Sequence, residues 1–393
     1  MAPEITPSSR LTAGPAVGVA SRWLGAGPPA QRLGPSEARS HHRSLVLQGL
    51  YRGRGLSRAD LSRELGLSRV TISDVVADLV DEGLVVELGT RAPSRPGKPA
   101  TMLDINRDGH HIIGLDLSKS GEFVGVVTNL DGAVVERAVL DIAQAQGEEA
   151  IVAVETLLFE LIDLAHQPVI GVGVGSPGIV DDQGVIVSAP NLGWRDVPLQ
   201  TRLSDACGLP VAVANDANAA VVGEFSFGGG EPDMMLVRIG RGVGSGLMID
   251  GRVVSGARHA AGEIGHVVSG TDVGEPCVCG NVGCLERWLA IPRIEAHLAE
   301  PGADRDAVLT EAGRRLGIVL APIVSALNLT EVVLAGPAGH ISGPLLAATQ
   351  STLHERTLAD SHGDMQLRMT ELGRDLIVLG AVVLVLRGQL GVT

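Results

Sequence analysis

The sequence contains few aromatic residues and no long apolar run. Only 2% of its 393 residues are Phe, Trp or Tyr although 45% are hydrophobic, so aliphatic side chains must fill the core. The longest apolar run near the C-terminus, residues 376–386, is too short to span a bilayer and predicts a buried helix. A signal peptide is not expected, because Glu4 precedes any apolar stretch and prolines interrupt the first 35 residues. We therefore expect a soluble, cytoplasmic protein without membrane contact.

Cysteine is scarce as well, and it is clustered. Three of the four cysteines fall within eight residues, which argues against a disulfide framework and indicates a metal site in a reducing compartment. The candidate ligands are His266, Cys277, Cys279 and Cys284. One imidazole and three thiolates match a closed tetrahedral zinc site, and four protein ligands leave no open position. The pattern therefore predicts one structural zinc per chain; the alternative is three free cysteines in a loop.

Positively charged residues are also few, and they are unevenly distributed along the chain. The net charge is -14, and residues 109–393 carry 34 acidic against 17 basic groups. Residues 1–39 carry 4 basic and 2 acidic groups, and residues 40–108 carry 10 and 9. A polyanion is therefore tolerated only near the N-terminal end of the chain.

The N-terminal hundred residues divide into a tail and a small domain. Residues 1–36 contain six prolines and five glycines without a hydrophobic period, which predicts a disordered tail. Residues 37–108 then contain two short helical patterns, opened by Ser57 with Asp60 and by Ser68, and two strand patterns. Two helices joined by a tight turn and followed by a β-hairpin predict a winged helix-turn-helix. The alternative is a small helical bundle with a hairpin and no ligand.

The second helix of this domain carries donor side chains opposite its apolar stripe, and the hairpin loop carries positive charge. The residues that we expect to contact operator DNA are Ser68, Arg69, Thr71 and Ser73 on the helix and Arg91, Arg95 and Lys98 in the loop. Hydroxyl and guanidinium groups donate to base edges and phosphates, and a basic loop suits the DNA backbone or minor groove. Together on this scaffold they predict a DNA-binding face.

Residues 109–393 form two αβ halves, which predicts a duplicated architecture with a ligand-binding cleft between the halves. The first half has strand patterns at 112–117, 122–130, 133–140 and 169–175 and a helical pattern at 148–165. A second set begins near Met234 and includes a strand pattern at 331–336.

Three motifs in the second region identify a family resemblance. GEIGH (262–266), PCVCGNVGCLE (276–286) and VANDANAA (213–220) resemble the ROK family, which groups repressors, open reading frames and sugar kinases. The winged helix ahead of them resembles the repressor branch. The resemblance implies an α/β fold with an N-terminal winged helix-turn-helix and a duplicated actin/hexokinase-like domain. It also implies a homodimer or homotetramer.

The resemblance also implies a sugar site. The implied sugar-binding residues are Asn215, Asp216, Glu263, His266 and Glu286. In the family's kinases the Asp is the general base, which places that role on Asp216. Carboxylates, an amide and an imidazole can satisfy vicinal hydroxyls, and His266 would bind zinc through one ring nitrogen and a sugar hydroxyl through the other.

The phosphate-binding turns of a ROK kinase are altered. The first turn resembles Asp-x-Gly-Gly-Thr in the family but reads DLSKS at 116–120 here, and Arg241 replaces a hydroxyl residue in the second. We therefore expect a sugar-responsive regulator of carbohydrate metabolism, acting on operator DNA as a repressor, without catalytic residues and without ATP or Mg²⁺. The alternative is an ATP-dependent sugar kinase with an accessory DNA-binding domain, in which Lys119 and Arg241 attract phosphate. Glucose, xylose, N-acetylated amino sugars and phosphorylated sugars all fit the expected pocket.

Overall fold

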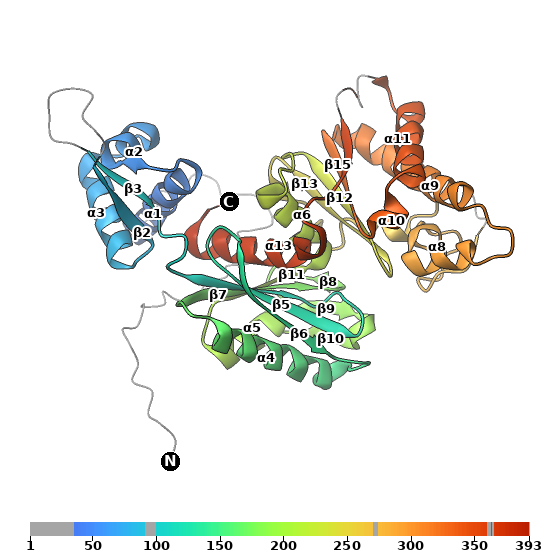
Figure 1. Ribbon diagram of the computed structural model, residues 1–393, viewed down its shortest axis with the longest axis horizontal. Helices are drawn as coiled ribbons and strands as arrows, with labels where there is room; N and C mark the ends of the chain where they lie inside the picture. The colour runs from blue at the N-terminus through green and yellow to red at the C-terminus, as the bar shows by residue number, and fades with distance from the viewer. Residues whose placement is uncertain (1–34, 91–99, 270–273, 360–362, 364, 393) are drawn as a thin grey trace, which may run out of the picture.

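The computed structural model describes residues 35–90, 100–269, 274–359, 363 and 365–392 (Figure 1). The expected tail lies outside these residues up to position 34, and its last two residues belong to the first helix instead. The expected basic loop residues Arg91, Arg95 and Lys98 also lie outside the described residues.

The N-terminal domain consists of three helices and a small antiparallel sheet in the order β1-β3-β2. Its elements are α1 (Pro35–Arg52), β1 (Leu56–Ser57), α2 (Arg58–Leu65), α3 (Arg69–Asp81), β2 (Val85–Thr90) and β3 (Thr101–Ile105). The expected capping box is present, because Ser57 and Asp60 satisfy each other's backbone N–H groups. Gly66 ends α2 in the left-handed conformation, and the Ser68 side chain caps α3. The expected winged helix-turn-helix is thus formed.

The first half of the larger region is built on a five-stranded sheet in the order β11-β7-β4-β5-β6. Its main elements are β4 (His111–Asp116), β5 (Glu122–Thr128), β6 (Val134–Asp141), α4 (Gly147–Leu164), β7 (Val169–Ser176), α5 (Leu199–Cys207) and β11 (Val211–Asn215). A small sheet of β8 (Ile179–Val180), β9 (Ile186–Ala189) and β10 (Trp194–Val197) lies between β7 and α5 in the chain. Helices α4 and α5 cover one face of the main sheet (Figure 1).

The second half repeats the plan with a sheet in the order β14-β13-β12-β15-β16. Its strands are β12 (Met234–Ile239), β13 (Val243–Ile249), β14 (Arg252–Val253), β15 (Glu331–Ala335) and β16 (Gln366–Met369). Its helices are α7 (Glu286–Leu289), α8 (Ile291–Leu298), α9 (Arg305–Leu327), α10 (Ala338–Ile341) and α11 (Pro344–Arg356). Helices α9 and α11 pack against each other, and their apolar sides form one core with this sheet.

Two helices, α6 (Asp216–Phe227) and α13 (Leu376–Val385), connect the halves (Figure 1). Their backbones touch where both helices carry glycine: a Cβ on Gly380 would lie 1.8 Å from the carbonyl oxygen of Ala219. Helix α13 also packs on β4 and β7, so it covers the sheet face opposite α4. Its position agrees with the buried helix expected at 376–386. Among the described residues, no helix combines the length and hydropathy needed to cross a membrane.

The C-terminal segment joins the DNA-binding domain to the rest of the molecule. After α13 the chain continues as a π-helical turn, Leu386–Leu390, whose leucines share one core with α1 residues such as Leu47 and Leu50. The Tyr51 hydroxyl donates to the carbonyl of Leu130, at a distance of 2.9 Å, across the same junction. The winged helix is therefore packed on the larger region rather than tethered by a linker.

Candidate functional site

The N-terminus of α6 holds the first two expected site residues. Asn215 ends β11, and its amide oxygen accepts the backbone N–H groups of Ala217 and Asn218. Its amide nitrogen donates to the carbonyl of Gly178 at 2.8 Å. Asn215 therefore acts as a helix cap that also ties α6 to the loop after β7.

Asp216, which follows it, is buried and paired with an arginine from the other half. One carboxylate oxygen accepts the Ala217 N–H at 2.8 Å, and the other forms an ion pair with Arg238 on β12. The Nε of Arg238 is buried and has no partner. The sequence analysis missed Arg238. The sequence did contain a signal for Arg238, because it is the only charged residue in the strand Met234–Ile239.

A second carboxyl group, Asp116 at the end of β4, lies within electrostatic range of this pair. Burial raises the pKa of Asp116, while hydrogen bonds from Ser118 and the charge of Arg238 oppose that shift. The Ser118 backbone N–H and hydroxyl both donate to the same Asp116 oxygen, at 2.9 and 2.6 Å. The altered first turn thus folds back on its own aspartate.

The remaining expected sugar residues come from the second half. Glu263 directly precedes a short 3₁₀ turn, Ile264–His266, and Glu286 opens α7. Burial raises the pKa of Glu263, and the nearby carboxylates of Asp216 and Glu286 raise it further, while His266 lowers it. Glu263 is therefore within electrostatic range of Asp216, from the first half, as well as of Glu286 and His266 from the second. Glu286 also accepts the backbone N–H of Val243, in the altered second turn, at 3.1 Å.

The four expected metal ligands are brought together, and one of them, His266, is within electrostatic range of Glu263. Nδ1 of His266 lies 3.5 Å from the Cys277 sulfur, and the sulfurs of Cys279 and Cys284 are 3.5 Å apart. All four ligand atoms lie within 4.8 Å of one another. Cys277 and Cys284 are buried, whereas Cys279 is exposed. The arrangement is a His/Cys3 cluster able to hold a metal ion.

The candidate DNA-contacting residues on α3 occupy its first turns. Arg69 and Ser73 are exposed, but the hydroxyls of Ser68 and Thr71 lie 2.9 Å apart, and Ser68 also caps the Thr71 N–H. Val70, which the sequence analysis did not consider, exposes 71% of its surface in the same turn.

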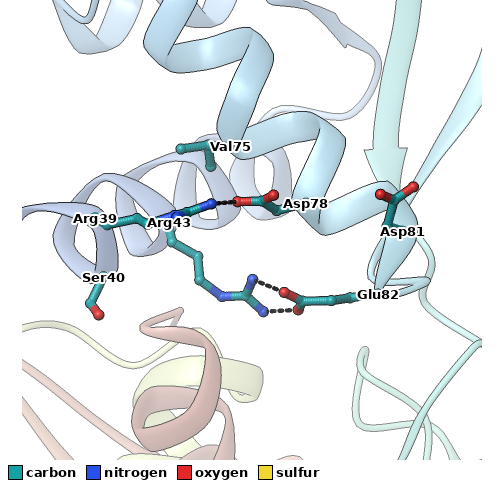
Figure 2. A pocket seen from close by; sticks show the side chains of 7 residues that line it. All are labelled: Arg39, Ser40, Arg43, Val75, Asp78, Asp81 and Glu82. Carbon is teal, nitrogen blue, oxygen red and sulfur yellow. Dashed lines mark hydrogen bonds and ion pairs between the residues drawn. The ribbon is translucent and has the colours of Figure 1, made fainter. Parts of the chain in front are cut away.

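Ion pairs hold α3 against α1 at the other end of the helix (Figure 2). Arg39 pairs with Asp78 at 2.6 Å, and both terminal nitrogens of Arg43 meet the Glu82 carboxylate. These residues line a surface hollow together with Ser40, Val75 and Asp81. Because α1 shares its core with the C-terminal turn, α3 is connected through α1 to the larger region.

Comparison of this sequence with known protein families and proteins identifies the family to which the chain belongs. Residues 112–388 match the ROK family, and residues 40–95 match the MarR family. The chain belongs to the ROK family. A xylose repressor of Caldicellulosiruptor bescii is 27% identical over 387 residues, covering 88% of this chain and 95% of that protein. A glucokinase of Halalkalibacterium halodurans is 32% identical over 246 residues, covering 54% of this chain and 74% of that enzyme.

The fold of this ROK protein also matches solved structures. A ROK family transcriptional regulator, described as a homologue of the E. coli MLC protein, superposes with a TM-score of 0.80 at 24% identity, covering 90% of this chain and 98% of that one. The predicted fold class, a winged helix-turn-helix ahead of a duplicated ROK domain, is therefore confirmed.

Proposed function

We propose that this ROK protein is a transcriptional repressor whose affinity for operator DNA is set by a sugar bound in the cleft. The main observation behind this proposal is that packed helices connect the proposed sugar site to the winged helix without a break. Asp216 in the cleft opens α6, α6 packs on α13, and the turn after α13 shares a core with α1 of the winged helix. The match to the xylose repressor, which spans both regions, supports the proposal.

The sugar would be held by Asn215, Asp216, Glu263, His266 and Glu286. Carboxylates accept hydrogen bonds from hydroxyl groups, and Nε2 of His266 offers one more polar contact. Because these residues come from both halves, a sugar would bind more tightly when the halves are closed around it than when they are open. This difference in affinity would shift the protein toward the closed state. Xylose heads the panel of candidate sugars because of the relative's name, followed by glucose, N-acetylated amino sugars and phosphorylated sugars.

On DNA, the first turns of α3 would enter the major groove, with Ser68, Arg69, Thr71 and Ser73 as candidate contacts. Arg91, Arg95 and Lys98 would supply positive charge to the backbone or minor groove. Two copies of the chain, in a homodimer or a homotetramer, would bind two half-sites separated by about one helical turn or a multiple of it.

The His/Cys3 cluster would hold one structural zinc ion. Zinc–sulfur bonds of about 2.3 Å in a tetrahedron place ligand atoms roughly 3.5–3.8 Å apart. The 3.5 Å separations in the cluster fit that geometry. The ion would lock His266 with Nδ1 on the metal and leave its other ring nitrogen for the sugar.

The proposal also includes the loss of sugar-kinase activity. A kinase offers backbone N–H groups of two turns to the ATP phosphates. In this chain the N–H of Ser118 donates to Asp116, and the N–H of Val243 donates to Glu286, so carboxylates already occupy both donors. An ion pair with Arg238 also engages one oxygen of the Asp216 carboxylate, which is the group that a kinase would use as its base. We therefore expect neither ATP nor Mg²⁺ to bind.

A sugar kinase is the second candidate, favoured by the retained Asp216 and the glucokinase relative. A coupled assay for ADP release over the sugar panel separates the two. We expect no sugar-dependent ADP release, and turnover with any sugar would overturn the proposed loss of activity.

The proposed regulator is tested first by a thermal-shift screen of the panel. A sugar present at a hundred times its dissociation constant should stabilise the protein by about 2.7 kcal/mol. Genomic footprinting should then find a protected site with two related halves. If no protected sequence exists in the host genome, the protein is not a repressor.

A further inference from the structure

Helix α3, which the proposed function places in the major groove, exposes the apolar side chain of Val70 in a turn where only polar contacts were expected. Val70 exposes 71% of its surface. It lies on the face of α3 opposite the buried stripe, which consists of Ile72, Val75, Val76 and Leu79. Its side chain therefore adds nothing to the core of the domain and is available to a ligand of that domain.

The neighbours of Val70 limit what this turn offers to DNA. The hydroxyls of Ser68 and Thr71 are engaged in the helix cap. Arg69 is exposed, and no ion pair of its guanidinium occurs among the described residues. The side chains of this turn that take no part in the helix cap are therefore those of Arg69 and Val70, side by side at the N-terminus of a 13-residue helix.

The charges along α3 fix which part of the helix approaches the groove. Asp74 and Asp81 lie on the same face as Val70, further toward the C-terminus, and both are exposed. Carboxylates there repel phosphates, whereas the first turn combines Arg69 with the positive end of the helix dipole. The helix would therefore meet DNA end-on, with its first turn deepest.

We propose that Val70 packs against the 5-methyl group of a thymine in each operator half-site, next to a guanine read by Arg69. The inference rests on the proposed DNA binding and names the chemistry that the first turn reads. The thymine methyl is the one apolar group that base pairs display in the major groove, and arginine pairs with the O6 and N7 of guanine. The preferred half-site would thus contain adjacent thymine and guanine contacts.

The test removes single methyl groups from the DNA. Each thymine of the footprinted operator is replaced in turn by deoxyuridine, which lacks only that methyl, and binding is measured by fluorescence anisotropy. Burial of one methyl group corresponds to about a fourfold change in affinity. We expect wild-type protein to lose about fourfold at one thymine position per half-site, and Val70→Ala to bind the thymine and deoxyuridine operators equally well.

Val152→Ala is the matched control, because Val152 is also an exposed valine on a helix but lies on α4, outside the winged helix. This variant should keep the deoxyuridine penalty of the wild type. Wild-type protein that binds the operator and tolerates deoxyuridine at every position overturns the inference and leaves the repressor proposal standing. A penalty that persists in Val70→Ala overturns it as well. Failure to find any operator overturns both.

Discussion

Replacing Arg368 with Met should destabilise the larger region more than any exposed arginine substitution does. Arg368 on β16 donates to Glu331 at 2.5 Å and to Glu224 at 2.7 Å. Glu224 is 0% exposed and Glu331 is 2% exposed, so the substitution leaves two buried carboxylates without their cation. Breaking a buried ion pair on one side costs about 3–5 kcal/mol.

The assay is thermal unfolding followed by circular dichroism, with Arg314→Met as the matched control. Arg314 also makes a two-point contact with a glutamate, Glu311, at 2.8 and 2.9 Å, but the two side chains are 45% and 36% exposed. An exposed pair contributes less than about 1 kcal/mol. At roughly 2–4 °C per kcal/mol, Arg368→Met should lower Tm by roughly 6–20 °C and the control by a few degrees at most.

A second substitution identifies the cause. Adding Glu224→Gln to Arg368→Met removes one of the two unpaired charges, so part of the lost Tm should return. Equal losses for Arg368→Met and Arg314→Met would refute the reasoning from burial. No recovery in the double variant would show that lost packing, rather than unpaired charge, dominates.

The remaining predictions concern the metal, pH and DNA. Cys279→Ser should lower the zinc content below one per chain by elemental analysis and should lower Tm; metal-free wild-type protein purified without chelators would contradict the zinc site. Burial at the domain junction lowers the pKa of His110 from its ordinary value of 6.5, so the folded state binds this proton more weakly than the unfolded state. Stability should therefore fall as pH drops below about 6.5, and His110→Gln should flatten that part of the Tm–pH curve; an unchanged curve would contradict this. Arg69→Ala should alter base preference, whereas Lys98→Ala should reduce the salt dependence of operator binding, and an unchanged salt slope would remove Lys98 from the phosphate contacts.

Much of the fold was predictable because its signals are local. The capping box at Ser57 and Asp60, and the spacing of the cysteine cluster, each fall within a few residues, and local geometry determines what they form. The family motifs added the duplicated architecture, which no local pattern specifies.

The features missed by the sequence depend on distant contacts. Helix α13 is apolar on every side, so its sequence predicts burial but not which surfaces it buries against. Its docking on the first sheet, on α6 and on the core of the winged helix could therefore not be predicted. Arg238 is an isolated charge in a strand, and its role emerges only when β12 is placed opposite Asp216 and Asp116. The closure of Ser118 onto Asp116 is by contrast local, because an aspartate commonly accepts the N–H group two residues further on.

The central claim is that a sugar in the cleft controls DNA binding, and one titration tests it most directly. Operator affinity is measured by fluorescence anisotropy with and without the sugar found in the thermal-shift screen, on wild-type protein and on Asp216→Ala. We predict that the sugar changes the affinity of the wild type, and that the variant binds sugar-free operator almost normally but no longer responds. If Asp216→Ala responds to the same sugar at the same concentration, the cleft is not the sensor and the proposed coupling is wrong.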